Sequence, residues 1–283
     1  MSAYTEKTEI LAEKIDWIAY TQKNNVEWQF PDYISNKWKR ITALPKYTHG
    51  EENQQGVRRY WNIATAKQGR MVIMDGSCTG TLQENRENVL QWLGQQDMKP
   101  TRLDFAIDIV RSSFNPKACV KHLRDGSVRT HAQSAMQVHD EFKGGFTQYV
   151  GTKASETYTR IYDKSLEQKT DYPWVRIETV YQGQRAEASL HAYLQHKTVK
   201  PLILAHVDFP KWRAWQRVMS GNVAKLSIPP RETRTRAWLL SRVAKSIARE
   251  IAMDEDQSFL FQLIDRIRDE YKLTFPDKPI VDW

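Results

Sequence analysis

Three short stretches of this 283-residue chain carry reactive side chains at alternate positions. They are Arg102–Val110, Tyr158–Lys164 and Trp174–Val180, and in each of them the positions between the reactive residues are mostly apolar. A period of two is typical of a β-strand with one face in the core and one face outside. The polar positions are Arg102, Asp104 and Asp108 in the first stretch, Tyr158, Arg160, Tyr162 and Lys164 in the second, and Arg176 and Glu178 in the third.

If the three strands are neighbours in one sheet, their polar faces form a single surface with three carboxylates, a phenol and several cations. Hard carboxylate oxygens bind Mg²⁺ or Mn²⁺, and such an ion polarises a phosphoryl oxygen. Arginine and lysine neutralise the charge that develops on a phosphate. A phenol beside a divalent cation loses its proton more easily and can attack phosphorus. The combination indicates phosphoryl transfer on DNA.

The spacing of the two aspartates limits the metal site. Asp104 and Asp108 are separated by roughly 13 Å on an ideal strand, so both cannot ligate one ion unless a bulge bends the strand. We expect one of them to bind the metal together with Glu178 and the other to orient an arginine or a nearby water. The spacing does not say which aspartate has which role.

Each of these residues also has a structural interpretation. A carboxylate on the polar face of a strand is often simply solvated, and a strand tyrosine is usually packed against its neighbours. Arg176 and Glu178 could form a surface ion pair. The presence of all these groups on three separately predicted strands is what favours a functional site.

The elements that would position these residues change character along the chain. Up to about residue 182 the segments are short and alternating, and beyond it the apolar spacing becomes helical. We predict an α+β fold, with a central antiparallel sheet, flanking helices and a helical C-terminal region. The predicted strands are Ile15–Thr21, Val57–Ile63, Arg70–Met74, Arg102–Val110, Phe146–Gly151, Tyr158–Lys164 and Trp174–Val180. Helices are predicted at Leu82–Gln95 and after Asn115-Pro116, where Asn can cap and Pro suits the first turn.

Two amphipathic helices are predicted near the end of the sequence, around the turn Asp254-Glu255-Asp256. Their apolar faces consist of Leu240, Val243, Ala244, Ile247 and Ile251, and of Leu260, Leu263, Ile264, Ile267 and Tyr271. The first helix has a basic face that could contact DNA, formed by Arg242, Lys245 and Arg249. We expect a catalytic domain over 10–182 and a helical region over 183–283. The C-terminal helices would pack on the sheet domain, or alternatively form a separate module for DNA contact or dimerisation.

The composition favours a polyanionic partner. The net charge is +8 and the pI is about 9.3, as in many nucleic-acid-binding proteins. The two cysteines, Cys78 and Cys119, match no metal-binding spacing and no disulfide framework, which is typical of a reducing cytoplasm. With a polar start and no long apolar stretch, we expect a soluble cytoplasmic protein without a membrane partner.

Four motifs, in this order, resemble those of the replication initiation factor family, the Rep_trans type of rolling-circle plasmid and phage initiators and conjugative-element relaxases. They are Thr101-Arg-Leu-Asp-Phe-Ala-Ile-Asp108, Tyr149-Val-Gly-Thr-Lys-Ala-Ser155, Tyr158-Thr-Arg-Ile-Tyr-Asp-Lys164 and Trp174-Val-Arg-Ile-Glu178. Ile15–Thr21 resembles the family's first strand, and the tail from Arg236 resembles its phage and conjugative branch. Thr152-Lys153 departs mildly from the usual Ser-Arg or Ser-Lys, and no His-x-His pair is present.

The resemblance implies a role for each matching residue. Tyr162 would form a covalent 5′-phosphotyrosine bond, and Asp104, Asp108 and Glu178 would supply an acidic site for Mg²⁺ or Mn²⁺. Arg160, Lys164 and Arg176 would contact the scissile phosphate. The further residues expected to contact DNA are Arg102, Lys153 and Tyr158, with Arg242, Lys245 and Arg249 of the basic helix.

The function implied is site-specific nicking and rejoining of origin DNA, at a single-stranded nick site within a duplex or a hairpin. A host polymerase would extend the 3′ end. A host helicase would unwind the duplex, because the chain has no Gly-x-x-x-x-Gly-Lys-Ser/Thr loop. One tyrosine per chain makes a homodimer plausible. The alternatives are a relaxase for conjugative transfer or excision, a metal-dependent nuclease that uses water, and a DNA-binding regulator without catalysis.

Overall fold

The computed structural model describes residues 9–22, 29–62, 70–74, 78, 86–95, 98–110, 114–140, 145–227, 244–253 and 258–274. The chain divides into two compact units, Met1–Ser227 and Ile228–Trp283, and each is described by itself. The sequence placed the end of the first domain near residue 182. The unit extends to Ser227 instead, because helices that follow residue 182 pack on its sheet.

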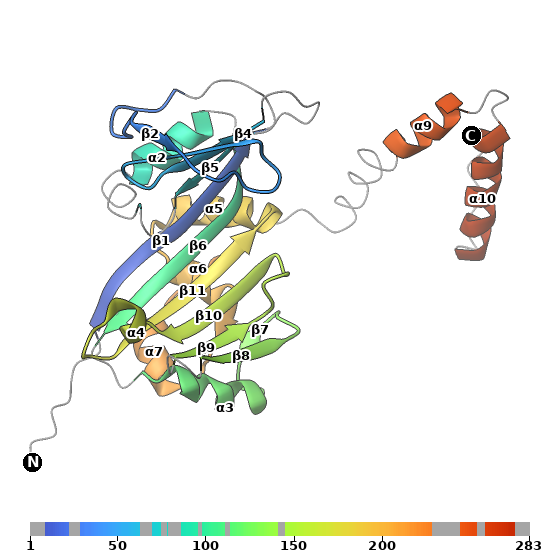
Figure 1. Ribbon diagram of the computed structural model, residues 1–283. Helices are drawn as coiled ribbons and strands as arrows, with labels where there is room; N and C mark the ends of the chain where they lie inside the picture. Colours follow the sequence, from blue (N-terminus) through green and yellow to red (C-terminus); the bar gives the residue numbers. More distant parts are fainter. Residues whose placement is uncertain are drawn as a thin grey trace, which may run out of the picture. The chain divides into compact units, whose positions relative to one another are not determined.

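The first unit is built on a ten-stranded antiparallel sheet with the strand order β2-β3-β4-β5-β1-β6-β11-β10-β9-β8 (Figure 1). Its strands are β1 (Glu9–Gln22), β2 (Trp38–Arg40), β3 (His49–Asn53), β4 (Arg58–Trp61), β5 (Arg70–Met74), β6 (Lys99–Val110), β8 (Ala135–Asp140), β9 (Gly145–Val150), β10 (Thr157–Asp163) and β11 (Trp174–Gln182). A separate pair joins β7 (Arg129–Thr130) to β12 (Val207–Asp208). The predicted α+β class with a central antiparallel sheet is confirmed.

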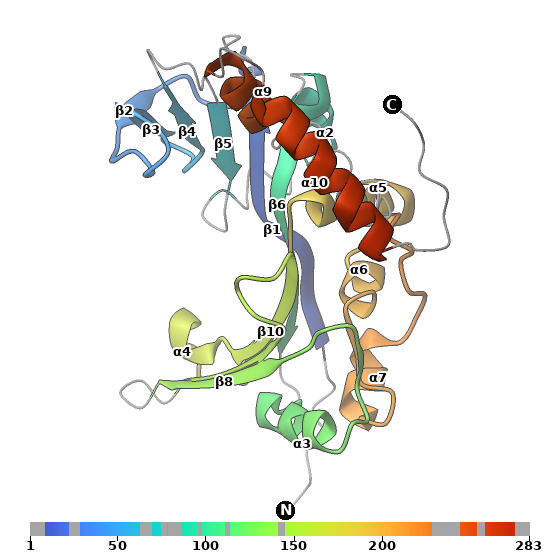
Figure 2. The same ribbon diagram turned by 90° about the vertical axis from the view of Figure 1, so that its right-hand side faces the viewer.

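Helices cover one face of this sheet. They are α5 (Gln184–His196), α6 (Lys200–Leu204) and α7 (Arg213–Met219), which lie together on one side of the sheet in Figure 2. The apolar positions of β6 and β11, including Phe105, Ile107 and Ile177, are fully buried in the core beneath them. Because side chains alternate along a strand, the reactive side chains of β6 and β11 lie on the face of the sheet opposite α5, α6 and α7.

The described segments of this unit also contain α2 (Arg86–Gln95), α3 (Cys119–Arg124) and α4 (Ser165–Gln168), with a 3-10 turn at Pro116–Ala118 before α3. The Asn115 side chain accepts a hydrogen bond from the backbone N–H of Lys117, as the Asn-Pro pair predicted. The predicted helix Leu82–Gln95 is confirmed from Arg86 onward, and its first four positions lie outside the described residues.

All seven predicted strands are present, although β1 and β6 are longer than predicted. The sequence did not predict five short strands: β2, β3, β7, β8 and β12. The second unit contains α9 (Ala244–Met253) and α10 (Ser258–Thr274), which confirm the two C-terminal amphipathic helices. Leu240, Arg242 and Val243 lie outside the described residues. Within the described segments, no helix combines the length and the apolar character that crossing a bilayer requires.

Candidate active site

The register of the central strands brings the predicted site residues into adjacent rows. Tyr162 on β10 lies opposite Arg176 on β11, and Arg176 lies opposite Asp108 on β6. One row further along, Arg160 lies opposite Glu178. Side chains directly opposite each other in an antiparallel pair lie close together on the same face. The sheet therefore joins the three polar strand faces into one surface, as the sequence predicted.

Arg176 is the centre of the first row. Its Nε and Nη2 donate to the two carboxylate oxygens of Asp108, each at 2.7 Å. Its Nη1 donates to Asp16 Oδ1 at 2.9 Å. Trp174 Nε1 donates to Asp108 as well, at 3.0 Å. Arg176 and Asp108 are both almost fully buried, so this is an internal ion pair and not the surface pair with Glu178 that the sequence allowed.

Asp16 was not among the predicted site residues. It lies at a β-bulge, because the pairing of β1 with β6 passes from Ile15–Phe105 directly to Trp17–Asp104. A bulge adds one residue to a strand and redirects its side chains. Asp16 lies on the polar face, two residues after Lys14, whose Nζ is 3.3 Å from its carboxylate. A possible signal in the sequence was the irregular spacing of Ile15 and Ile18, which are both buried.

Glu178 is the centre of the second row and has no solvent exposure. Arg160 Nη2 donates to its Oε1 at 2.5 Å. The Tyr162 hydroxyl donates a longer hydrogen bond of 3.4 Å to its Oε2. The guanidinium carbon of Arg160 lies 5.4 Å from the centroid of the Tyr162 ring. The candidate nucleophile thus lies between a carboxylate and an arginine.

The electrostatics of this pocket affect two groups in opposite ways. Burial, and then the charge of Glu178, raises the pKa of the Tyr162 phenol above its ordinary value, against the opposing effect of Arg176 and Arg160. Burial and the neighbouring Arg176 lower the pKa of Lys164. Without a further positive charge, Tyr162 is therefore held as the neutral phenol at neutral pH.

The two predicted metal-binding aspartates differ electrostatically. Burial raises the pKa of Asp104 to about 7, and the charge of Glu178 adds to the rise although Arg102 opposes it. Arg102 contacts both oxygens of Asp104, at 2.8 and 2.6 Å. Burial acts in the same sense on Asp108, but the hydrogen bonds from Arg176 and Trp174 outweigh it and lower its pKa. Asp108 is already neutralised by Arg176, whereas Asp104 shares its surroundings with a second carboxylate.

The predicted metal site fits these residues in part. Asp104, Asp108 and Glu178 are each bonded to a different arginine. The described part of the chain contains no group of three or more His, Cys, Asp or Glu side chains placed to hold a metal ion. Asp104 and Glu178 are two buried carboxylates whose charges oppose each other, an arrangement that a divalent cation would relieve. This pair fits a divalent ion better than Asp108 does.

A pocket of about 220 Å³ opens beside the phenol. It is lined by Tyr162 and the three predicted phosphate-contacting cations, together with residues that the sequence did not single out. The lining residues are Asp16, Thr147, Tyr149, Arg160, Tyr162, Lys164, Glu167 and Arg176. Lys164 follows the end of β10 instead of lying within it, and its Nζ is 3.3 Å from the exposed Glu167. The structure therefore brings Tyr162, Arg160, Lys164 and Arg176 to one cavity.

The remaining predicted DNA contacts lie at different places. Tyr158 packs against Tyr149 and Val180, with the two tyrosine ring centroids 6.3 Å apart. Lys153 Nζ lies 5.3 Å from the centroid of the Tyr149 ring. In the second unit Arg249 is exposed on α9, which also includes Lys245, and Arg242 lies outside the described residues.

A tyrosine with two arginines and a lysine around a pocket on an antiparallel sheet defines a candidate phosphoryl-transfer site. A family model described as replication initiation factor matches residues 98–264, and the chain belongs to this family. The match includes every residue predicted for the catalytic, metal and DNA-binding roles.

Two individual proteins are similar to this chain. "Putative DNA relaxase NicK" from Bacillus subtilis (strain 168) is 29% identical over 116 residues, which are 36% of this chain and 33% of the relative. The match thus spans about a third of that curated relative. The solved structure of a rolling-circle replication initiator protein from Geobacillus stearothermophilus aligns with a TM-score of 0.56 and 18% identity. It covers 76% of this chain and 92% of that one, which shows a shared fold.

Proposed function

We propose that this protein nicks and rejoins one strand of origin DNA and thereby starts rolling-circle replication of a mobile element. The observation that carries the proposal is the position of Tyr162, which lines one pocket together with Arg160, Lys164 and Arg176. Membership of the replication initiation factor family supports the same reading. The pocket and the matched motifs involve the same residues.

The proposed reaction exchanges one phosphodiester bond for another. The Tyr162 oxygen attacks the phosphorus and forms a bond to it, while the bond from phosphorus to the 3′ oxygen of the preceding nucleotide breaks. The phenolic proton passes to Glu178 Oε2, the acceptor in the hydrogen bond from this hydroxyl. The leaving 3′ oxygen takes up a proton from solvent water and becomes a 3′-OH for a polymerase to extend. The reverse transfer rejoins the strand, and no ATP is consumed.

The cations of the pocket have separate roles in this proposal. Lys164 reaches the pocket and its partner is the exposed Glu167, so it can turn to a phosphate at small cost. Arg176 is fixed by Asp108 and Asp16 and supplies a positive charge of fixed position. Arg160 lies beside the Tyr162 ring and favours the phenolate as it forms. Preorganised charges of this kind stabilise the transition state.

The proposal includes a divalent ion, Mg²⁺ or Mn²⁺, held by Asp104 and Glu178. Bound there, the ion would offset the carboxylate charge that raises the pKa of Tyr162 and would polarise a phosphoryl oxygen. Both aspartates hold an arginine through two oxygens. Asp104 is preferred as the ligand because burial and the charge of Glu178 raise its pKa, whereas Arg176, Trp174 and Lys14 already stabilise the charge of Asp108.

The test is covalent capture of DNA. The protein is incubated with Mn²⁺ and labelled single-stranded fragments of the element's own replication region, and the products are separated under denaturing conditions. We expect a protein–DNA adduct that is lost, by at least about 1000-fold, in Tyr162→Phe. Tyr20→Phe is the matched control, because it removes a buried hydroxyl that has no partner among the described residues. Continued cleavage by Tyr162→Phe would identify a hydrolytic nuclease. DNA binding without any cleavage by the unmodified protein would identify a regulator.

A relaxase for conjugative transfer or excision is the second candidate, and the name of the Bacillus subtilis relative favours it. The chemistry would be the same. An experiment in cells distinguishes the two roles. Loss of Tyr162 abolishes copying of the element if the protein is a replication initiator, and it abolishes transfer of the element if the protein is a relaxase. A host helicase, a host polymerase and a second copy of the chain are proposed partners in the replication role.

A further inference from the structure

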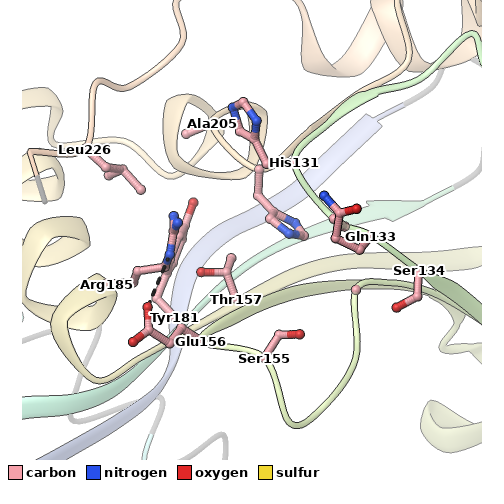
Figure 3. A pocket seen from close by; sticks show the side chains of 13 residues that line it. His131, Gln133, Ser134, Ser155, Glu156, Thr157, Tyr181, Arg185, Ala205 and Leu226 are labelled. Atoms are coloured by element: carbon pink, nitrogen blue, oxygen red, sulfur yellow. Dashed lines mark ion pairs between the residues drawn. The ribbon is translucent and has the colours of Figure 1, made fainter. Parts of the chain in front are cut away.

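A second pocket, of about 280 Å³, lies at the opposite end of β10 from Tyr162. Its walls come from the turn between β9 and β10, from the segment after β7, and from the start of α5 (Figure 3). In Figure 3 Arg185 and Glu156 lie on one side of the pocket and Gln133 and Ser134 on the other, with Thr157 between them. No step proposed for the nicking reaction uses these residues.

The floor of this pocket is buried and contains a polar atom without a partner. Thr157, Tyr181 and His206 form the floor, and none is more than 7% exposed. The Tyr181 hydroxyl donates to the Leu202 carbonyl, and His206 Nδ1 is hydrogen-bonded to Thr159. The Thr157 hydroxyl, in contrast, has no hydrogen-bond partner within the described residues. A buried hydroxyl without a partner is costly, and this one lies directly beneath the pocket.

The charges of the pocket balance. Arg185 Nε lies 3.6 Å from the Glu156 carboxylate. Burial, together with the charges of Arg185 and His131, lowers the pKa of His206 to about 4, so its imidazole is neutral at pH 7. An anion such as phosphate would compete with Glu156 for Arg185. The pocket therefore suits a neutral ligand with apolar faces and polar edges.

The residues that line the pocket provide both apolar surfaces and hydrogen-bonding groups. Leu226, Ala205 and the Tyr181 ring are apolar surfaces, and the side chains of Gln133, Ser134 and Thr157 carry hydrogen-bonding groups. A nucleobase has the same division between flat apolar faces and polar edges. The volume is close to the lower end of the range for small-molecule sites, roughly 300 Å³.

The β9–β10 hairpin links this pocket to the candidate active site. Gly151 begins its turn with a φ of +87°, and a Cβ there would lie 3.1 Å from the Thr157 carbonyl oxygen, so the turn packs closely on the pocket floor. Tyr149, Lys153 and Tyr158 lie on or beside the same hairpin. Thr157 and Tyr162 are roughly 17 Å apart along β10, and their side chains point to opposite faces of the sheet. A single strand that reaches both would therefore pass around the turn between β9 and β10, from the helix-covered face to the face of Tyr162.

We propose that this pocket binds one unstacked base of the single strand on which Tyr162 acts, a few nucleotides from the nick. The inference rests on the proposed function, because it assumes that the strand passes along the β9–β10 hairpin. Single-stranded DNA offers its bases without the cost of breaking a duplex, and proteins read such bases by stacking and by hydrogen bonds to their edges. The pocket would thus help to fix the register of the strand at Tyr162.

The test separates base contacts from backbone contacts. All chains carry Tyr162→Phe so that no adduct accumulates, and binding is measured by fluorescence anisotropy. The probes are a mixed-sequence DNA 20-mer and an abasic 20-mer with the same backbone. Ser134→Trp places an indole at the exposed rim of the pocket, and Ser220→Trp is the matched control at an exposed serine that is not among the lining residues.

We expect Ser134→Trp to weaken binding of the base-containing 20-mer by about 5- to 10-fold and to leave the abasic 20-mer unchanged. Equal affinities for Ser134→Trp and Ser220→Trp would overturn the assignment. Equal loss for both probes would overturn it as well, because it would indicate backbone contact.

Two further measurements identify the ligand and show whether a negative result concerns the pocket or the nicking function. Deoxynucleoside monophosphates are titrated against both serine variants. The nucleotides bind in the pocket if Ser134→Trp weakens their binding and Ser220→Trp does not. If this is seen while the two variants bind the 20-mer equally, the pocket is a site for free nucleotides and the proposal is wrong. Adduct formation is measured separately in chains that retain Tyr162. An adduct with unchanged 20-mer binding rejects the pocket alone, whereas pocket-dependent binding without any adduct rejects the nicking function.

Discussion

Arg176 holds two carboxylates at once, Asp108 through two nitrogens and Asp16 through the third. The three side chains come from β11, β6 and the bulge of β1, so the pairing fixes three strands at the floor of the pocket. Removing one member of a buried ion pair leaves the other charge unpaired, and this costs more than the pair contributes when it is intact.

We predict that Asp108→Asn lowers the free energy of unfolding by about 3 kcal/mol and that it also reduces adduct formation, because Arg176 is no longer fixed. Urea denaturation and the adduct assay measure the two effects. Glu52→Gln is the control: its partner Lys39 is exposed, so the change should cost less than about 0.5 kcal/mol. Similar losses in the two variants would show that the Asp108 pair has no special role.

Asp104 and Glu178 are the pair assigned to the divalent ion. We predict that Asp104→Asn and Glu178→Gln each raise the Mn²⁺ concentration for half-maximal adduct formation by about 10-fold or more. Asp108→Asn should lower the maximal amount of adduct without shifting that concentration. A shift in Asp108→Asn that exceeds the shift in Asp104→Asn would assign the ion to the other aspartate.

At the scale of elements, a buried network joins the helix-covered face of the sheet to the segment between α6 and β12. Thr159 on β10 is hydrogen-bonded to Thr179 on β11 at 2.7 Å and to His206 at 2.8 Å. Burial lowers the pKa of His206 to about 4. The folded state therefore keeps this imidazole neutral over a pH range in which the unfolded chain binds a proton.

This difference makes the stability of the fold depend on pH. The contribution of His206 is fully present above pH 6.5, the ordinary pKa of histidine, and it is lost as the pH falls toward about 4. The expected loss over this range is about 3 kcal/mol. His206→Gln should flatten the dependence, and His191→Gln, at an exposed position, should leave it unchanged. Urea denaturation at pH 7, 5.5 and 4.5 measures the slopes, and equal slopes in all three proteins would contradict the assignment.

At the scale of the whole molecule, the net charge of +8 predicts binding of DNA that weakens with salt. The basic face predicted from the sequence, Arg242, Lys245 and Arg249, is the part of this charge proposed to contact the duplex around the origin. We predict that the triple variant Arg242→Gln, Lys245→Gln, Arg249→Gln reduces the slope of log K against log [NaCl] for duplex DNA by up to about 3. Adduct formation on a short single strand should be unchanged. An unchanged slope would show that this face is a solvated surface.

Several features of this protein could be predicted from the sequence by itself. The period of two in Arg102–Val110 and Trp174–Val180 predicted which residues face the core, because side-chain direction alternates strictly along a strand. Four motifs in order predicted the family, and the helical spacing near the end of the sequence predicted α9 and α10. These features depend on local periodicity or on residue type, and both can be read from a linear string.

The tertiary structure decided which charges pair and how deeply they lie. The contact of Asp16 with Arg176 depends on the pairing of β1 with β6 and of β6 with β11, and that pairing also defines the bulge in β1. Asp104 and Asp108 have the same residue type on the same strand, yet the pKa of one is raised and that of the other is lowered. Burial raises the pKa of both groups. The contacts of Arg176 and Trp174 outweigh it at Asp108, whereas at Asp104 burial and the charge of Glu178 outweigh Arg102. Such long-range contacts exist only after the sheet has formed, and for that reason the sequence left the choice between the two aspartates open.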